Sequence, residues 1–73
     1  MPPIPVLSGQ EVIKAFQSLG WRVVRRKGSH VMMARAGQTA TLAVPDHDEV
    51  AKGTLRTLIR SANLTIDEFL AAI

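Results

Sequence analysis

The sequence predicts a small α+β domain in the order α-β-β-β-α, in which helices cover one face of a three-stranded antiparallel sheet. Apolar residues recur at helical spacing near both ends of the chain. Between them, segments 21–26, 30–35 and 39–44 have strand-like patterns and are joined by short turns. A length of 73 residues allows one domain with a modest core. Two amphipathic helices on one face of the sheet would complete a two-layer structure.

The first helix is predicted to begin after Ser8, which can cap its first turn. Glu11 lies three residues later and can bond back to the Ser8 backbone, which makes a capping box. Gly20 suits the left-handed position just past the end of a helix. Residues 1–7, which include three prolines, are expected to form an extended tail, and residues 8–73 a single domain. The apolar positions of this helix are Val12, Ile13, Phe16 and Leu19.

The three strands are predicted from alternation and from the turns between them. His30, Met32 and Ala34 would share one face of the second strand, because successive strand residues point to opposite sides. Pro45 is expected to end the third strand, since proline cannot donate a ladder hydrogen bond. We expect Phe16 and Trp21 to belong to the core.

Two further helices are predicted, the first from about residue 52 to 62 and a short one over 66–73. Asn63 can end the former in a left-handed conformation, and Thr65 can cap the latter. The longer helix has an apolar side and a basic side. The apolar residues are Leu55, Leu58, Ile59 and Ala62, and the basic ones are Lys52, Arg56 and Arg60.

Composition limits the classes of function. The chain has no cysteine, which excludes disulfides and thiolate metal sites. No apolar run approaches the roughly 20 residues of a membrane span, and the N-terminus does not resemble a signal peptide. We therefore expect a cytoplasmic protein that makes no use of a membrane. The net charge of +3 favours acidic partners, either nucleic acid or an acidic protein.

The tetrapeptide Lys27-Gly28-Ser29-His30 lies in a strongly basic segment. Residues 21–35 hold five basic side chains and no acid. A histidine can take and give a proton near neutral pH, and RNA carries its own nucleophile in the 2′-hydroxyl. Cations beside the phosphate would stabilise the charge that develops, so this chemistry needs no metal or cofactor. The alternative is that His30 merely follows a turn. The residues predicted to hold RNA here are Arg25, Arg26, Lys27, Gly28 and Ser29.

Two other features have weaker functional interpretations. Lys52 and Arg56 could contact phosphates from the second helix, or they could belong to an ordinary solvated helix face. His47 could act as a second acid or base, or bind a metal with Asp46 and Asp48. Its spacing matches no zinc pattern, and a structural residue in a loop is the favoured interpretation. We therefore predict no metal site.

Four segments taken in order resemble the HicA toxin family, the RNA-cleaving halves of toxin–antitoxin pairs. They are residues 9–13 with 19–21, residues 27–30, residues 44–47, and residues 52–59 with 64–69. The resemblance implies a fold like that of a double-stranded-RNA-binding domain. It also implies an endoribonuclease acting on mRNA, a catalytic histidine at His30 with Gly28 and Ser29 in the same motif, and a HicB-type antitoxin that covers the active site.

The other RNA-binding assignments, to Arg25, Arg26, Lys52 and Arg56, rest on charge alone. The ribonuclease is one of three possible functions. A non-catalytic RNA-binding module of the same fold would need the basic surfaces but not His30. A third possibility is a subunit whose main role is to bind an acidic protein. The preference for single- or double-stranded RNA is left open by the sequence.

Overall fold

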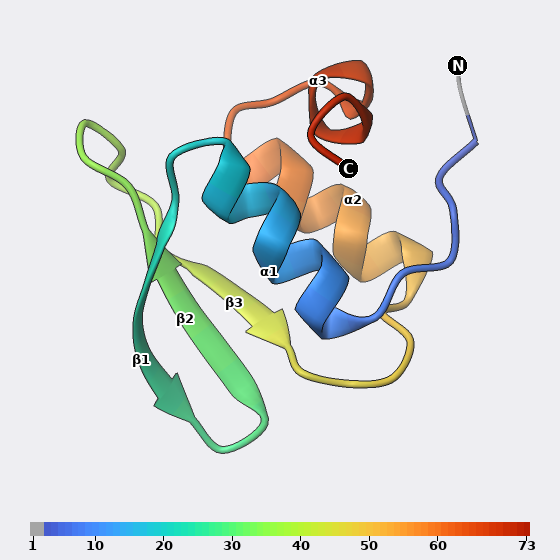
Figure 1. The fold of residues 1–73 in the computed structure, drawn as a ribbon. Helices are drawn as coiled ribbons and strands as arrows, with labels where there is room; N and C mark the ends of the chain where they lie inside the picture. The colour runs from blue at the N-terminus through green and yellow to red at the C-terminus, as the bar shows by residue number, and fades with distance from the viewer. Residues whose placement is uncertain (1–2) are drawn as a thin grey trace.

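A computed structural model describes residues 3–73 and has the predicted order of elements. These are α1 (Gly9–Ser18), β1 (Arg22–Lys27), β2 (His30–Ala34), β3 (Leu42–Pro45), α2 (Lys52–Ser61) and the short α3 (Ile66–Leu70). Helices α1 and α2 both pack against β3 and lie on the same side of the sheet (Figure 1). The predicted α+β class, with helices on one face of three antiparallel strands, is thereby confirmed.

Within residues 3–73, the sheet has the strand order β1-β2-β3 and the helices lie on one of its faces only (Figure 1). Val31 and Met33 of β2 are buried on the helical side, as are Leu42 and Val44 of β3. Strand β1 is exposed along its whole length, as expected for an edge strand that extends beyond the helices. A β-bulge between Val23 and Arg25 shifts its register against β2. The two faces of the sheet therefore differ in burial, and one of them is open to solvent.

Two predicted boundaries were wrong by three residues, and those of β1, β2 and α2 differ by one. Strand β3 begins at Leu42 rather than at residue 39, because Leu42 pairs with Met33 near the end of β2 and little of β2 remains for earlier residues to pair with. Pro45 is the last residue of the strand, so the prediction that it ends β3 is confirmed, and it lies opposite His30. It is tolerated because β3 is an edge strand. Helix α3 ends at Leu70 rather than at residue 73.

The helix ends carry the local signals that the sequence predicted. The Ser8 hydroxyl accepts a hydrogen bond from the Glu11 backbone N–H at 3.2 Å, and Glu11 accepts one from the Ser8 backbone N–H at 3.0 Å. Thr65 and Glu68 form the same reciprocal pair at α3. Asn63 has a φ of 61°, so the left-handed end of α2 is confirmed. None of the helices in residues 3–73 combines the length and apolar character that a membrane crossing requires.

The core lies between the sheet and the helices. Phe16 of α1 contacts both Trp21 and Phe69, with ring centroids 6.3 Å and 5.1 Å apart. The prediction that Phe16 and Trp21 are core residues is therefore confirmed. Ile4 and Leu7 are also buried, so part of the segment before α1 packs on the core. Residues 1 and 2 of the expected tail lie outside the described residues.

Candidate active site

The turn between β1 and β2 places His30 at the start of β2. Lys27 and His30 are directly opposite in the register, which leaves Gly28 and Ser29 as the two-residue connection. Gly28 has a φ of +60°, a left-handed conformation that glycine adopts without steric cost. A Cβ at Gly28 would meet nothing within 4 Å, so the turn is open to solvent on that side. Its geometry therefore leaves room for a ligand to approach the backbone.

His30 lies on the face of the sheet that no helix covers. Its neighbour Val31 is buried on the helical side, and alternation along β2 puts His30 on the other side. Lys27 shares that face, because directly opposed residues of antiparallel strands point the same way. Arg25 is opposite Met32, two residues further along, and belongs to the same face. His30, Lys27 and Arg25 are all exposed. The open face thus combines an imidazole with two cations.

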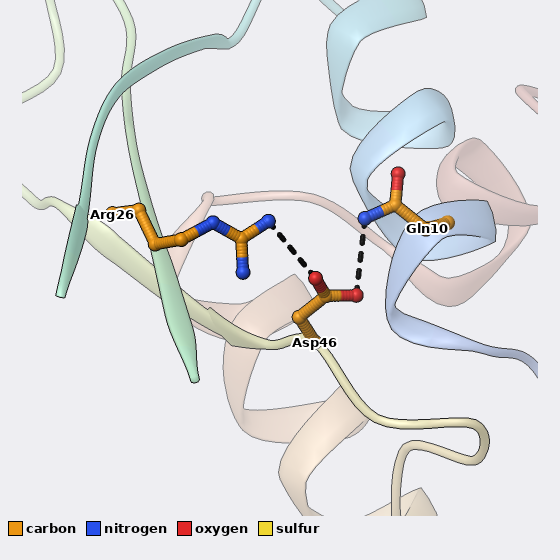
Figure 2. A network of polar contacts seen from close by, with 3 residues as sticks. All are labelled: Gln10, Arg26 and Asp46. Carbon is orange, nitrogen blue, oxygen red and sulfur yellow. Dashed lines mark hydrogen bonds and ion pairs between the residues drawn. The ribbon is translucent and has the colours of Figure 1, made fainter. Parts of the chain in front are cut away.

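Arg26 lies on the opposite face from Arg25 and Lys27. It is paired with the buried Val31, and its guanidinium forms an ion pair with the Asp46 carboxylate at 2.9 Å. The other oxygen of Asp46 accepts a hydrogen bond from the Gln10 side-chain amide at 3.0 Å. Figure 2 shows the two donors approaching Asp46 from different elements, Arg26 from β1 and Gln10 from α1. Of the three consecutive basic residues 25–27, the central one, Arg26, is thus paired with an acid of the protein itself.

The Asp46 carboxylate is held in its charged form by these two partners. The hydrogen bond from Gln10 and then the one from Arg26 lower the pKa of Asp46 from its ordinary value, and the positive charge of Arg26 acts in the same direction. A carboxylate that accepts one bond on each oxygen is fixed in orientation.

Backbone contacts join the same segment to the turn and to α1. The Asp46 N–H donates to the Ser29 carbonyl at 2.7 Å, and the Gly9 N–H donates to the His47 carbonyl at 2.8 Å. A Cβ on Gly9 would overlap the Pro45 carbonyl oxygen and lie 2.8 Å from the Asp46 Cα. Residues 45–47 are therefore packed tightly between the start of α1 and the turn before His30.

The basic residues of α2 belong to the other layer of the molecule. Lys52 and Arg56 are exposed on α2, which packs against β3 and α3. Figure 1 shows α2 well apart from the turn between β1 and β2. Arg56 and Arg60 instead border an open groove of about 740 Å³ that runs between α2 and the start of α3. The structure brings Arg25 and Lys27 together with His30 but does not bring Lys52 and Arg56 there.

His47 has no metal-binding arrangement around it. Among residues 3–73, no group of three or more histidine, aspartate or glutamate side chains is placed to hold a metal ion. The Asp46 carboxylate, considered from the sequence as a metal ligand, is bonded to Arg26 and Gln10.

Sequence reasoning missed the pairing of Asp46 with Arg26 and Gln10, and it gave Gln10 no role beyond the start of a helix. The only signal was that both residues lie in short segments resembling a known family.

Comparisons with known proteins give one family match and one similar solved structure. A family model described as HicA toxin of bacterial toxin-antitoxin matches residues 9–64, from the start of α1 to just beyond α2. A solved structure titled "Toxin-Antitoxin complex from Streptococcus pneumoniae" contains a chain with 30% sequence identity and a TM-score of 0.70. That match covers 80% of this chain and 98% of the other. A comparison with curated proteins gave no match.

Proposed function

This chain belongs to the HicA toxin family, and from that premise we propose that it is an endoribonuclease that cleaves mRNA by metal-independent acid–base catalysis at His30. The family resemblance predicted from four short segments of sequence is confirmed by the match over residues 9–64. The ribonuclease activity is the proposal. It is carried by one observation, the exposed imidazole of His30 on the open sheet face beside Lys27 and Arg25.

The proposed reaction uses only groups of the protein and the RNA. The His30 imidazole takes the proton of a 2′-hydroxyl, and the 2′-oxygen forms a bond to the adjacent phosphorus. The bond from phosphorus to the 5′-oxygen breaks, and the leaving oxygen takes up a proton from the protonated His30 imidazole, which returns to its neutral form. The products are a 2′,3′-cyclic phosphate and a free 5′-hydroxyl. Lys27 and Arg25 would stabilise the negative charge that grows on the phosphate in the transition state.

The predicted RNA-binding residues differ in how close their side chains lie to His30. Arg25 and Lys27 share the face of His30 and would contact the phosphates nearest to the cleaved bond. Gly28 leaves its side of the turn open, and the Ser29 hydroxyl could donate to a phosphate oxygen. Arg26 would have to exchange its Asp46 partner for a phosphate. Lys52 and Arg56 would contact only an RNA long enough to reach the helical layer.

A HicB-type antitoxin is the proposed protein partner. The similar solved structure is titled a toxin–antitoxin complex, which supports a partner of this kind. An acidic surface laid over Arg25, Lys27 and His30 would neutralise the phosphate-binding cations and exclude RNA from the imidazole. Because the proposed substrate is mRNA, we also propose that the protein acts in the cytoplasm.

Cleavage of a defined RNA in the presence of EDTA tests the function. We expect the wild-type protein to cleave, His30→Ala to lose activity by about 100-fold or more, and His47→Ala, at the other exposed histidine, to retain it. Circular dichroism checks the fold of each variant. Cleavage by folded His30→Ala at the wild-type rate would overturn the assignment. If wild type and variant bind RNA equally and neither cleaves, the chain is a non-catalytic RNA-binding module.

A further inference from the structure

We propose that Asp46 is a positioning residue for His30. Its contacts join the turn before the histidine to the first helix. The inference rests on the proposed catalytic role of His30 and goes beyond it to what holds the imidazole in place. It gives a role to two sequence segments, residues 9–10 and 45–47, that the proposed reaction does not use.

The side chain of Asp46 bonds to two elements, β1 and α1. One oxygen receives the Arg26 guanidinium of β1 at 2.9 Å, and the other receives the Gln10 amide of α1 at 3.0 Å. Arg26 is adjacent to Lys27, the last residue of β1 before the turn. The carboxylate therefore ties the outer end of β1, an exposed edge strand, to the start of a helix whose inner side is buried in the core.

The backbone of Asp46 acts on the residue directly before His30. Its N–H donates to the Ser29 carbonyl at 2.7 Å. That carbonyl, the His30 N–H and the His30 Cα belong to one planar peptide unit. A hydrogen bond that holds the oxygen therefore also holds the orientation of the peptide plane that contains the His30 Cα. Pro45 lies opposite His30 in the register of β2 and β3. Asp46 thus controls the orientation of the peptide that carries the imidazole.

Residues 45–47 pack against the start of α1. The Gly9 N–H donates to the His47 carbonyl at 2.8 Å, and Gly9 has no space for a side chain against Pro45 and Asp46. From Gly9 the helix runs directly into Val12 and Phe16, which are fully buried. A continuous path of contacts therefore leads from the core through residues 45–47 to the turn.

The expected effect is on catalysis more than on stability. Partly exposed ion pairs contribute little to the free energy of unfolding. A catalytic group displaced by about 1 Å, however, can cost about 100-fold in rate. Without the Asp46 side chain the turn keeps its backbone hydrogen bond to Ser29 but loses its ties to Arg26 and Gln10, so His30 would sample geometries that do not reach the 2′-hydroxyl.

The test uses three variants: Asp46→Ala, Arg26→Ala, and the double variant that combines these two changes. The control variant is Asp48→Ala. Asp48 is an exposed acid in the same loop and makes no side-chain hydrogen bond or ion pair within residues 3–73. We expect Asp46→Ala to lower kcat by about 10-fold or more with little change in KM, and Asp48→Ala to behave as wild type. The double variant should be no worse than Asp46→Ala alone, because the two side chains act as one unit. Asp46→Asn keeps an acceptor of the same size and should be intermediate.

A second readout does not depend on cleavage. Amide hydrogen exchange and ¹⁵N relaxation of residues 27–30 should show faster exchange and greater mobility in Asp46→Ala than in wild type. Wild-type kcat together with an unchanged turn in Asp46→Ala would overturn the proposal. If His30→Ala cleaves as well as wild type, the proposed function is wrong. The exchange data then still decide whether Asp46 holds the turn: a mobile turn supports that role and an unchanged turn refutes it.

Discussion

Gly9 packs directly on the Pro45 carbonyl, with no space between them for even a single methyl group. A Cβ at Gly9 would overlap that oxygen, and the next nearest atoms, the Asp46 Cα at 2.8 Å and the His47 nitrogen at 3.1 Å, also belong to the backbone. Backbone atoms cannot swing aside as the end of a flexible side chain can. The contact therefore explains why a residue with poor helix propensity stands at the first position of α1.

Gly9→Ala is expected to lower the free energy of unfolding by about 1–3 kcal/mol, the usual range for inserting a methyl group into a filled space. Gly53→Ala is the matched control, because Gly53 also lies in the first turn of a helix and a Cβ there meets nothing within 4 Å. That change should be neutral or stabilising, by up to about 1 kcal/mol. Urea unfolding measures both, and equal effects of the two substitutions would contradict the packing argument.

Gly28→Ala should lower stability by about 1–2 kcal/mol for a different reason. A Cβ there would meet no atom, so the cost is purely that of holding an L-residue at a φ of +60°. Gly28→Asn should cost less than Gly28→Ala, since asparagine tolerates the left-handed region. The same unfolding experiment decides it. An asparagine variant less stable than the alanine variant would show that the side chain, not the backbone, limits this position.

The stability of the protein should depend on pH through Asp46. Gln10 and Arg26 lower the pKa of Asp46 in the folded protein, and the charge of the adjacent His47 acts the same way. A lowered folded-state pKa contributes stability above the unfolded-state pKa of about 3.9, and this stability is lost as the pH falls through the folded-state value. Wild type should therefore exceed Asp46→Asn in stability at neutral pH, with the difference shrinking below roughly pH 5.

Urea unfolding of both proteins between neutral pH and about pH 3 measures this difference. Asp48→Asn serves as the control and should follow wild type over the whole range. A difference between wild type and Asp46→Asn that stays constant as the pH falls would mean that the charge of Asp46 is not what Arg26 and Gln10 stabilise.

Local sequence signals predicted most of the fold. The capping boxes at Ser8 and Thr65 gave the starts of α1 and α3, because such caps are formed by residues three apart in the chain. Alternation separated His30 from Val31 and Met33, and the structure shows that Val31 and Met33 are on the buried face. The start of β3 was placed too early because strand propensity at residues 39–41 is local, whereas pairing depends on where β2 ends.

The candidate site was predicted only in part, for the same physical reason. The basic segment and His30 are contiguous in sequence, so their proximity could be foreseen. The bond between Gln10 and Asp46 joins residues 36 positions apart, and the ion pair between Arg26 and Asp46 joins a strand to a distant loop. Charge alone could not separate Arg26 from Arg25 and Lys27. That separation required the register, which turns Arg26 toward the helices.

The three consecutive basic residues of β1 should therefore differ in RNA binding. Lys27→Ala and Arg25→Ala remove cations from the face of His30, whereas Arg26→Ala removes a guanidinium already paired with Asp46. For single-stranded RNA, each lost phosphate contact should reduce the slope of log K against log salt by about 0.7. We expect that reduction for Lys27→Ala and Arg25→Ala, and a smaller one for Arg26→Ala.

Binding can be measured by fluorescence anisotropy in the His30→Ala background, so that the RNA stays intact. Lys14→Ala is the control for net charge, because Lys14 is an exposed cation on α1, in the helical layer. Its slope should equal that of the His30→Ala parent. A reduction for Arg26→Ala as large as that for Lys27→Ala would contradict the prediction, since it would mean that Arg26 leaves Asp46 to bind a phosphate. In that case the tie between Asp46 and the turn would be broken in the RNA complex.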